Sequence, residues 1–96
     1  MIKLNEIYKT AKGYNPKRER VDVTYGLREL YVNPSHIVLA RENEELRHAN
    51  AESSIIDDLS PEARFSEVII SSQGQSSRIV DVVASPSQIA HLCRGE

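Results

Sequence analysis

Three histidines and one cysteine are the first candidates in this chain for holding a zinc ion, and together with its many serines they could form a nucleophilic triad. His91 and Cys93 are two positions apart, so their side chains would not face each other on a helix. The sequence contains neither a Cys-x-x-Cys nor a His-x-x-x-His pair to complete a tetrahedral site. We therefore read Cys93 as a small packed hydrophobe and His91 as a solvated residue.

Other kinds of catalysis also lack their sequence signatures. The adjacent carboxylates at 44–45 and 57–58 would diverge on a helix or a strand, whereas an acid–base couple needs one shared pocket. There is no Gly-x-Ser-x-Gly elbow. The four glycines stand too far apart for a phosphate-binding loop. The sequence predicts a protein that is not an enzyme and that uses no metal or cofactor.

One constellation has the pattern of a binding surface, because cations and tyrosines alternate in the N-terminal part of the chain. Such residues could neutralise a nucleic-acid backbone and stack on its bases. Residues 1–28 hold seven Lys or Arg against three acids, whereas the remainder holds five against eleven. This polarity could steer an acidic partner to one end. The candidate contacts for a partner or a nucleic acid are Lys9, Lys12, Tyr14, Lys17, Arg18 and Arg20.

The elements that would position these residues fit one domain of 96 residues, 40% apolar and 27% charged. Alternation around Ile2 and Leu4 predicts a first strand. The polar residues of 9–20, with Gly13 and Pro16, predict a long loop.

A second strand is predicted over residues 21–32, where the apolar positions change phase near Gly26. A β-bulge or a turn at that glycine would absorb the change. Asn33-Pro34 should end the segment. The apolar run 37–40 then reads as a short buried strand.

Three more segments complete the predicted domain. Residues 41–62 are charged and read either as a helical excursion or as a flexible insertion. Two β-branched runs, 65–71 and 78–83, flank a glycine-containing turn and predict a hairpin. Ser85-Pro86 followed by Gln88 predicts a capped helix that ends near Gly95. The expected fold is α+β: a small antiparallel sheet or partly open barrel of about five strands, with a short C-terminal helix and a charged insertion at 41–62.

The order of these segments resembles the FlbD-like family of small flagellar, swarming-motility proteins and similarly built small proteins of tailed phages. The resemblance rests on the start Met1–Leu4, the turn Asn33-Pro34-Ser35-His36-Ile37, the apolar hairpin and the Ser85-Pro86 helix start. Residues 9–20 and 41–62 are insertions relative to the compact flagellar pattern, and a phage-encoded accessory protein would accommodate them. The resemblance implies no catalytic residue.

These observations predict a small protein-interaction or regulatory module. Its partner would be another protein, or a second copy of itself through a strand edge. A nucleic-acid-binding protein that uses the basic N-terminal loop is the alternative. No run approaches the 18 apolar residues of a membrane span, and no signal peptide or second cysteine points to an oxidising compartment. We therefore expect no membrane partner and a cytoplasmic location, in the host cytoplasm if the protein is phage-encoded.

Overall fold

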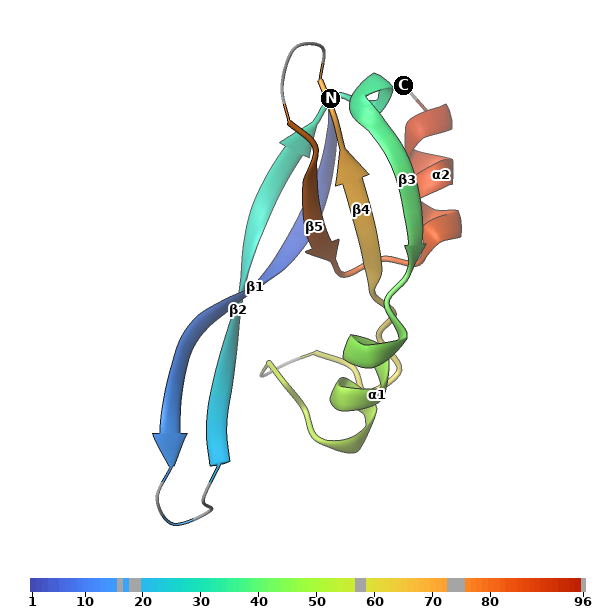
Figure 1. The fold of residues 1–96 in the computed structure, drawn as a ribbon. Helices are drawn as coiled ribbons and strands as arrows, with labels where there is room; N and C mark the ends of the chain where they lie inside the picture. The colour runs from blue at the N-terminus through green and yellow to red at the C-terminus, as the bar shows by residue number, and fades with distance from the viewer. Residues whose placement is uncertain (16, 18–19, 57–58, 73–75, 96) are drawn as a thin grey trace.

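A computed structural model describes residues 1–15, 17, 20–56, 59–72 and 76–95, with the backbone alone at 11–15 and 20–23. Five strands form one open antiparallel sheet in the order β2-β1-β5-β4-β3 (Figure 1). The elements are β1 (Ile2–Asn15), β2 (Arg20–Val32), the 3-10 turn η1 (Pro34–His36), β3 (Ile37–Glu42), α1 (Glu44–Glu52), β4 (Ser66–Ile70), β5 (Arg78–Val82) and α2 (Pro86–Arg94). The predicted α+β class is confirmed.

The strands β1 and β2 form a long hairpin that projects away from the rest of the sheet (Figure 1). Their pairing runs from Ile2 opposite Val32 to Asn15 opposite Arg20. Fourteen extended residues span roughly 46 Å, so this arm accounts for most of the molecule's 48 Å length. The predicted loop over 9–20 is therefore wrong at 9–15 and at 20. Pairing with the opposite strand stabilises segments whose own strand preference is weak.

The predicted bulge at Gly26 is also wrong, because β2 is continuous through this residue. The irregularity lies on the opposite strand, between Lys9 and Ala11. A Cβ atom on residue 26 would lie 2.8 Å from Thr10 Cγ2 and 3.2 Å from Tyr8 Cζ. Gly26 is thus required by the close approach of neighbouring side chains.

The apolar positions change phase because two cores lie on opposite faces of the sheet. Successive side chains of a strand point to opposite faces, and the hairpin contributes even-numbered residues to one core and odd-numbered residues to the other. The first core contains Ile2, Leu4, Val32, Val68, Val80, Val82 and Ile89. The second contains Ile7, Leu46 and Phe65, bordered by Tyr25, Ile55, Ile56, Leu59, Ala63 and Val83.

The segment predicted as a buried strand, 37–40, instead belongs to β3 at the edge of the sheet. Val38 is 67% exposed and Leu39 is 41% exposed. The register shifts between Ile37 and Leu39, which indicates a bulge on this edge strand. An apolar run of strand length cannot by itself distinguish a central strand from an edge strand.

The segment 41–62 was predicted to be either a helical excursion or a flexible insertion. The helical alternative is correct for residues 44–52, which form α1. Asn43 caps this helix by accepting a hydrogen bond from the Leu46 amide at 3.1 Å. Asn50 is 1% exposed, and its Nδ2 donates to the Ser60 carbonyl at 2.8 Å. The single face of α1 that carries Leu46 and Asn50 is the buried one, so a mostly polar helix can still dock on the sheet.

The predicted C-terminal helix and its capping box are confirmed in α2. Ser85 Oγ accepts from the Gln88 amide at 3.2 Å, and Gln88 Oε1 accepts from the Ser85 amide at 2.7 Å. Ile89 is fully buried in the first core. The helix ends at Arg94, and the Gly95 amide donates to the carbonyl oxygens of the last turn.

We expect Ser85→Ala to lower the free energy of unfolding by about 1 kcal/mol, because the first-turn amide loses its acceptor. For a domain of this size the melting temperature should fall by roughly 4–8 °C. Ser77→Ala removes an exposed hydroxyl elsewhere and serves as the control. Thermal unfolding followed by circular dichroism measures both, and equal melting temperatures for the two variants would contradict the role of the cap.

Candidate binding groove

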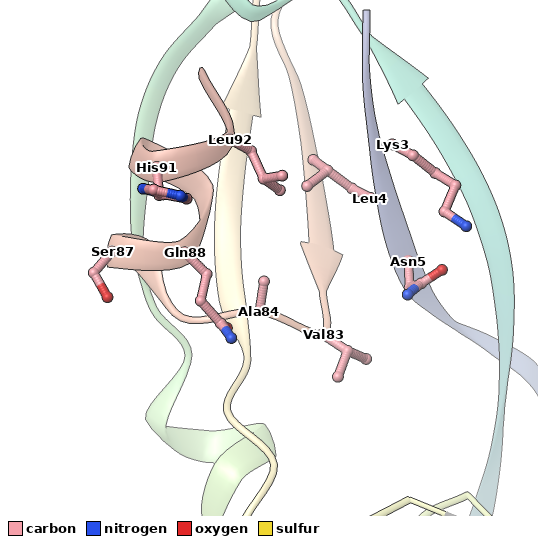
Figure 2. A pocket seen from close by; sticks show the side chains of 9 residues that line it. All are labelled: Lys3, Leu4, Asn5, Val83, Ala84, Ser87, Gln88, His91 and Leu92. Atoms are coloured by element: carbon pink, nitrogen blue, oxygen red, sulfur yellow. The ribbon is translucent and has the colours of Figure 1, made fainter. Parts of the chain in front are cut away.

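A groove follows α2 along the side that faces β1. In Figure 2, Leu92 and Leu4 approach each other from the helix and the strand, with Val83 and Ala84 at the end of β5 below them. The central hollow has a volume of about 500 Å³, within the range of ligand sites. It is lined by Lys3, Leu4, Asn5, Val83, Ala84, Ser87, Gln88, His91 and Leu92.

Two further hollows extend this groove in both directions along α2. One of about 380 Å³ shares Lys3, His91 and Leu92 with the central hollow and reaches Gly95. The other, of about 390 Å³, shares Val83, Ala84 and Gln88 and reaches Glu62 and Arg64. The nine residues of α2 are about 13 Å long, which matches about four residues of extended chain. We call the three hollows together the α2–β1 groove.

The groove exists because β5 pairs with only a short part of β1 before the chain turns away from it. The two strands pair at Glu6–Val82 and Ile7–Asp81, and one further bond joins the Val83 amide to the Asn5 carbonyl at 2.9 Å. The chain then turns into α2, which lies on the first core. Within the described part of the chain, no strand pairs with residues 2–4 on this side. A strand of the sheet thus has one open edge that faces a helix.

The charges along the groove are not evenly distributed. The central hollow is lined by Lys3 and His91 and by no acidic residue. Lys3 Nζ lies 3.6 Å from Glu29 Oε1, and both side chains are at least half exposed. At the α2 N-terminal end, the Arg64 guanidinium donates to Glu42 at 2.8 and 3.0 Å, which lowers the pKa of the Glu42 carboxyl. Figure 2 shows the Lys3 side chain pointing away from α2, so apolar and uncharged polar side chains form most of the centre of the groove.

A separate hollow, which we call the α1 hollow, lies between the β1–β2 arm and α1 and has a volume of about 360 Å³. Its lining residues include Lys9, Tyr25, Asn43, Glu45 and Asp81. Asn43 Nδ2 donates to Asp81 Oδ1 at 2.9 Å. Burial raises the pKa of the Asp81 carboxyl, although the hydrogen bond from Asn43 opposes this effect. The ionised form of Asp81 is consequently less favourable in the folded protein than in the unfolded chain.

A raised folded-state pKa for Asp81 gives a definite pH dependence. The folded protein holds this proton more tightly, so the contribution of Asp81 to stability is best below the unfolded pKa and declines as pH rises through the folded pKa. Asp81→Asn removes the charge and can still accept the bond from Asn43. We expect the melting temperature of this variant relative to wild type to increase between acidic pH and pH 7. A difference that stays constant across this range would contradict the shift.

The residues predicted as contacts lie on the arm, and the structure does not bring them to the groove. Lys9 is exposed on β1 and lines the α1 hollow. Lys17 is exposed and lies between β1 and β2 in the sequence. Lys12 and Tyr14 belong to β1 and Arg20 to β2, and their side chains lie outside the described part. Arg18 is outside the described residues altogether. The backbone places Lys9, Lys12, Tyr14 and Arg20 on one hairpin instead of a loop.

Sequence reasoning did not single out the groove residues. Ile89, Leu92 and Cys93 have the i, i+3, i+4 spacing that is typical of one buried stripe on a helix. Leu92 is nevertheless 41% exposed at the groove rim. Cys93 packs partly buried against the first core, as expected. The only local signal for the groove was a helix with three apolar positions, and no pattern in the sequence reveals which of them a neighbouring strand leaves uncovered.

Comparisons with known proteins provide no family for this chain: no family model, no curated protein and no solved structure matches it. Among the described helices, none is long and apolar enough to cross a membrane. In the same described residues, no three His, Cys, Asp or Glu side chains gather where they could hold a metal ion.

Proposed function

We propose that this protein is a non-enzymatic interaction module that binds another protein through the α2–β1 groove. The observation that carries the proposal is the open edge of β1 beside α2, with the exposed Leu92 at the rim of the groove and the buried Leu4 beneath it. Surfaces of this kind, where apolar side chains lie next to a strand edge, are used for protein recognition. As part of the same proposal, the protein is a cytoplasmic accessory protein, of flagellar or phage type as its turn and cap motifs suggest.

The arm favours one second candidate function, nucleic-acid binding. The hairpin extends away from the cores (Figure 1), and both Lys9 and Lys17 are exposed on it. A projecting basic hairpin could follow a phosphate backbone. The acidic remainder of the chain would oppose this approach, so we rank it below protein binding.

One experiment separates the two functions. The purified protein is immobilised and exposed to lysate of its source cell, in parallel with Leu92→Glu, which places a charge at the groove rim. Ile79→Glu is the matched control, because Ile79 is 63% exposed and follows the odd-numbered alternation of the opposite face. We expect wild type and Ile79→Glu to retain the same protein at moderate salt and Leu92→Glu to lose it.

The nucleic-acid arm of the experiment uses single- and double-stranded DNA and RNA at about 50 and 200 mM salt. Phosphate binding by the arm would weaken with a log–log salt slope of a few units. Alanine at Lys12, Lys17, Arg18 and Arg20 would flatten that slope. A salt-sensitive complex of this kind, with no protein whose retention depends on Leu92, would overturn the proposed function.

A further inference from the structure

We propose that a second copy of this chain pairs with the outer edge of β2, so that two sheets join into one across a two-fold axis at Tyr25. This interface goes beyond the proposed function, because it uses the β2 edge and not the α2–β1 groove, and each can fail without the other. Three features support it: the difference between the two sheet edges, the width of the arm, and the self-complementary sequence of β2.

The two edge strands, β2 and β3, differ in how well they are protected against pairing with another strand. Natural edge strands avoid such pairing by being short or by carrying proline, lysine or a bulge. β3 has six residues, follows the proline-containing turn η1 and carries a register shift between Ile37 and Leu39. β2 has thirteen residues with neither proline nor lysine, and the irregularity of the hairpin lies on β1. β2 is therefore the edge that can accept another strand.

The outer part of the arm is narrower than a stable sheet. β5 pairs with β1 only at Glu6 and Ile7, whereas β1 and β2 continue together to Asn15 and Arg20 (Figure 1). Within the described residues, the outer arm is thus a ribbon of two strands. Such a ribbon is marginally stable in water, and three or more strands are needed for independent stability. A second copy would supply the missing strands, because each β2 would border the arm of the other copy.

The sequence of β2 is complementary to itself when two copies pair antiparallel. With Tyr25 on the two-fold axis, Asp22 of one copy is at the register position opposite Arg28 of the other, and Val23 is opposite Leu27. Symmetry repeats both pairs. Opposite charges and apolar residues directly opposite each other stabilise antiparallel strands. Leu27 is 43% exposed and the Arg28 side chain is 53% exposed, so both are accessible to a partner.

Neighbouring registers lose this complementarity. The axis must pass through a residue, because the outward backbone groups of a strand belong to every second residue. An axis at Thr24 would place Arg20 opposite Arg28, which are like charges. An axis at Gly26 would place Asp22 opposite a leucine. Charge and apolar pairing therefore favour the axis at Tyr25.

Analytical ultracentrifugation of the full-length protein over a range of concentrations tests the interface. We expect wild type to form a dimer, and Leu27→Lys to raise its dissociation constant about tenfold or more, because symmetry places two lysines in the paired edge. Leu39→Lys is the matched control, since Leu39 is 41% exposed on the other edge strand, and it should leave the dissociation constant unchanged. A monomer at all concentrations, or equal effects of the two variants, overturns the proposal.

Asp22→Lys tests the charge pairing and provides a second variant if Leu27→Lys unfolds. It would place like charges opposite Arg28 twice, so the dissociation constant should rise about fivefold or more at low salt. Glu52→Lys makes the same change of charge at an exposed position of α1 and should have little effect. Equal effects of Asp22→Lys and Glu52→Lys overturn the proposed pairing.

The register can be measured directly with a nitroxide label on Tyr31→Cys, in a Cys93→Ala background. Tyr31 is 58% exposed. With the axis at Tyr25, the two labelled positions are about twelve residues apart along the paired strands, which is roughly 40 Å. Pulsed electron paramagnetic resonance measures this distance, and a separation below about 30 Å or above about 50 Å overturns the proposed register.

Discussion

Phe65→Ala is expected to lower the free energy of unfolding by about 3–5 kcal/mol. Phe65 is fully buried at the centre of the second core, where it packs with Ile7 and Leu46. Truncation removes apolar contacts and leaves a cavity that the surrounding backbone cannot close. The Phe65 carbonyl also accepts the Asn43 amide at 2.8 Å, so disturbance at this position should reach the cap of α1.

Urea unfolding measures this loss, and amide hydrogen exchange shows where it acts. Exchange should accelerate first in α1 and in residues 53–56, which depend on the second core. Phe65→Leu keeps most of the volume and should be milder. If Phe65→Ala accelerated exchange in α2 as much as in α1, the division into two cores would be wrong.

Ile89→Ala is expected to cost about 2–5 kcal/mol. Ile89 is the buried residue of α2 and packs with the valines of β4 and β5 in the first core. A helix of nine residues is too short to persist without such packing. Loss of Ile89 should therefore release α2 and remove one wall of the groove, so we expect retention of the partner protein to fall together with stability.

Ile79→Ala is the matched control for this prediction, because it removes the same atoms from a side chain that is 63% exposed. Its effect on stability should stay within about 0.5 kcal/mol. Equal destabilisation by the two substitutions would mean that α2 is not anchored through Ile89.

The elements that the sequence alone predicted correctly are those whose hydrogen bonds close within a few residues. Ser85, Pro86 and Gln88 specify the start of α2, since the cap joins positions three apart. The hairpin of β4 and β5 is likewise local, because only seven residues, 71–77, separate its two strands in the sequence. Asn33-Pro34 ends β2 because proline cannot continue the ladder.

What only the tertiary structure decided depends on partners distant in the sequence. Residues 9–15 have loop-like composition, yet they form a strand because β2 pairs with them. The phase change near Gly26 depends on which face of the sheet each core covers, which alternation within one strand cannot reveal. The groove depends on where β5 leaves β1 and on the direction in which α2 then crosses the sheet. Leu92 is consequently a groove residue for a reason that lies in the relative placement of β1 and α2, and no local pattern of side chains encodes that placement.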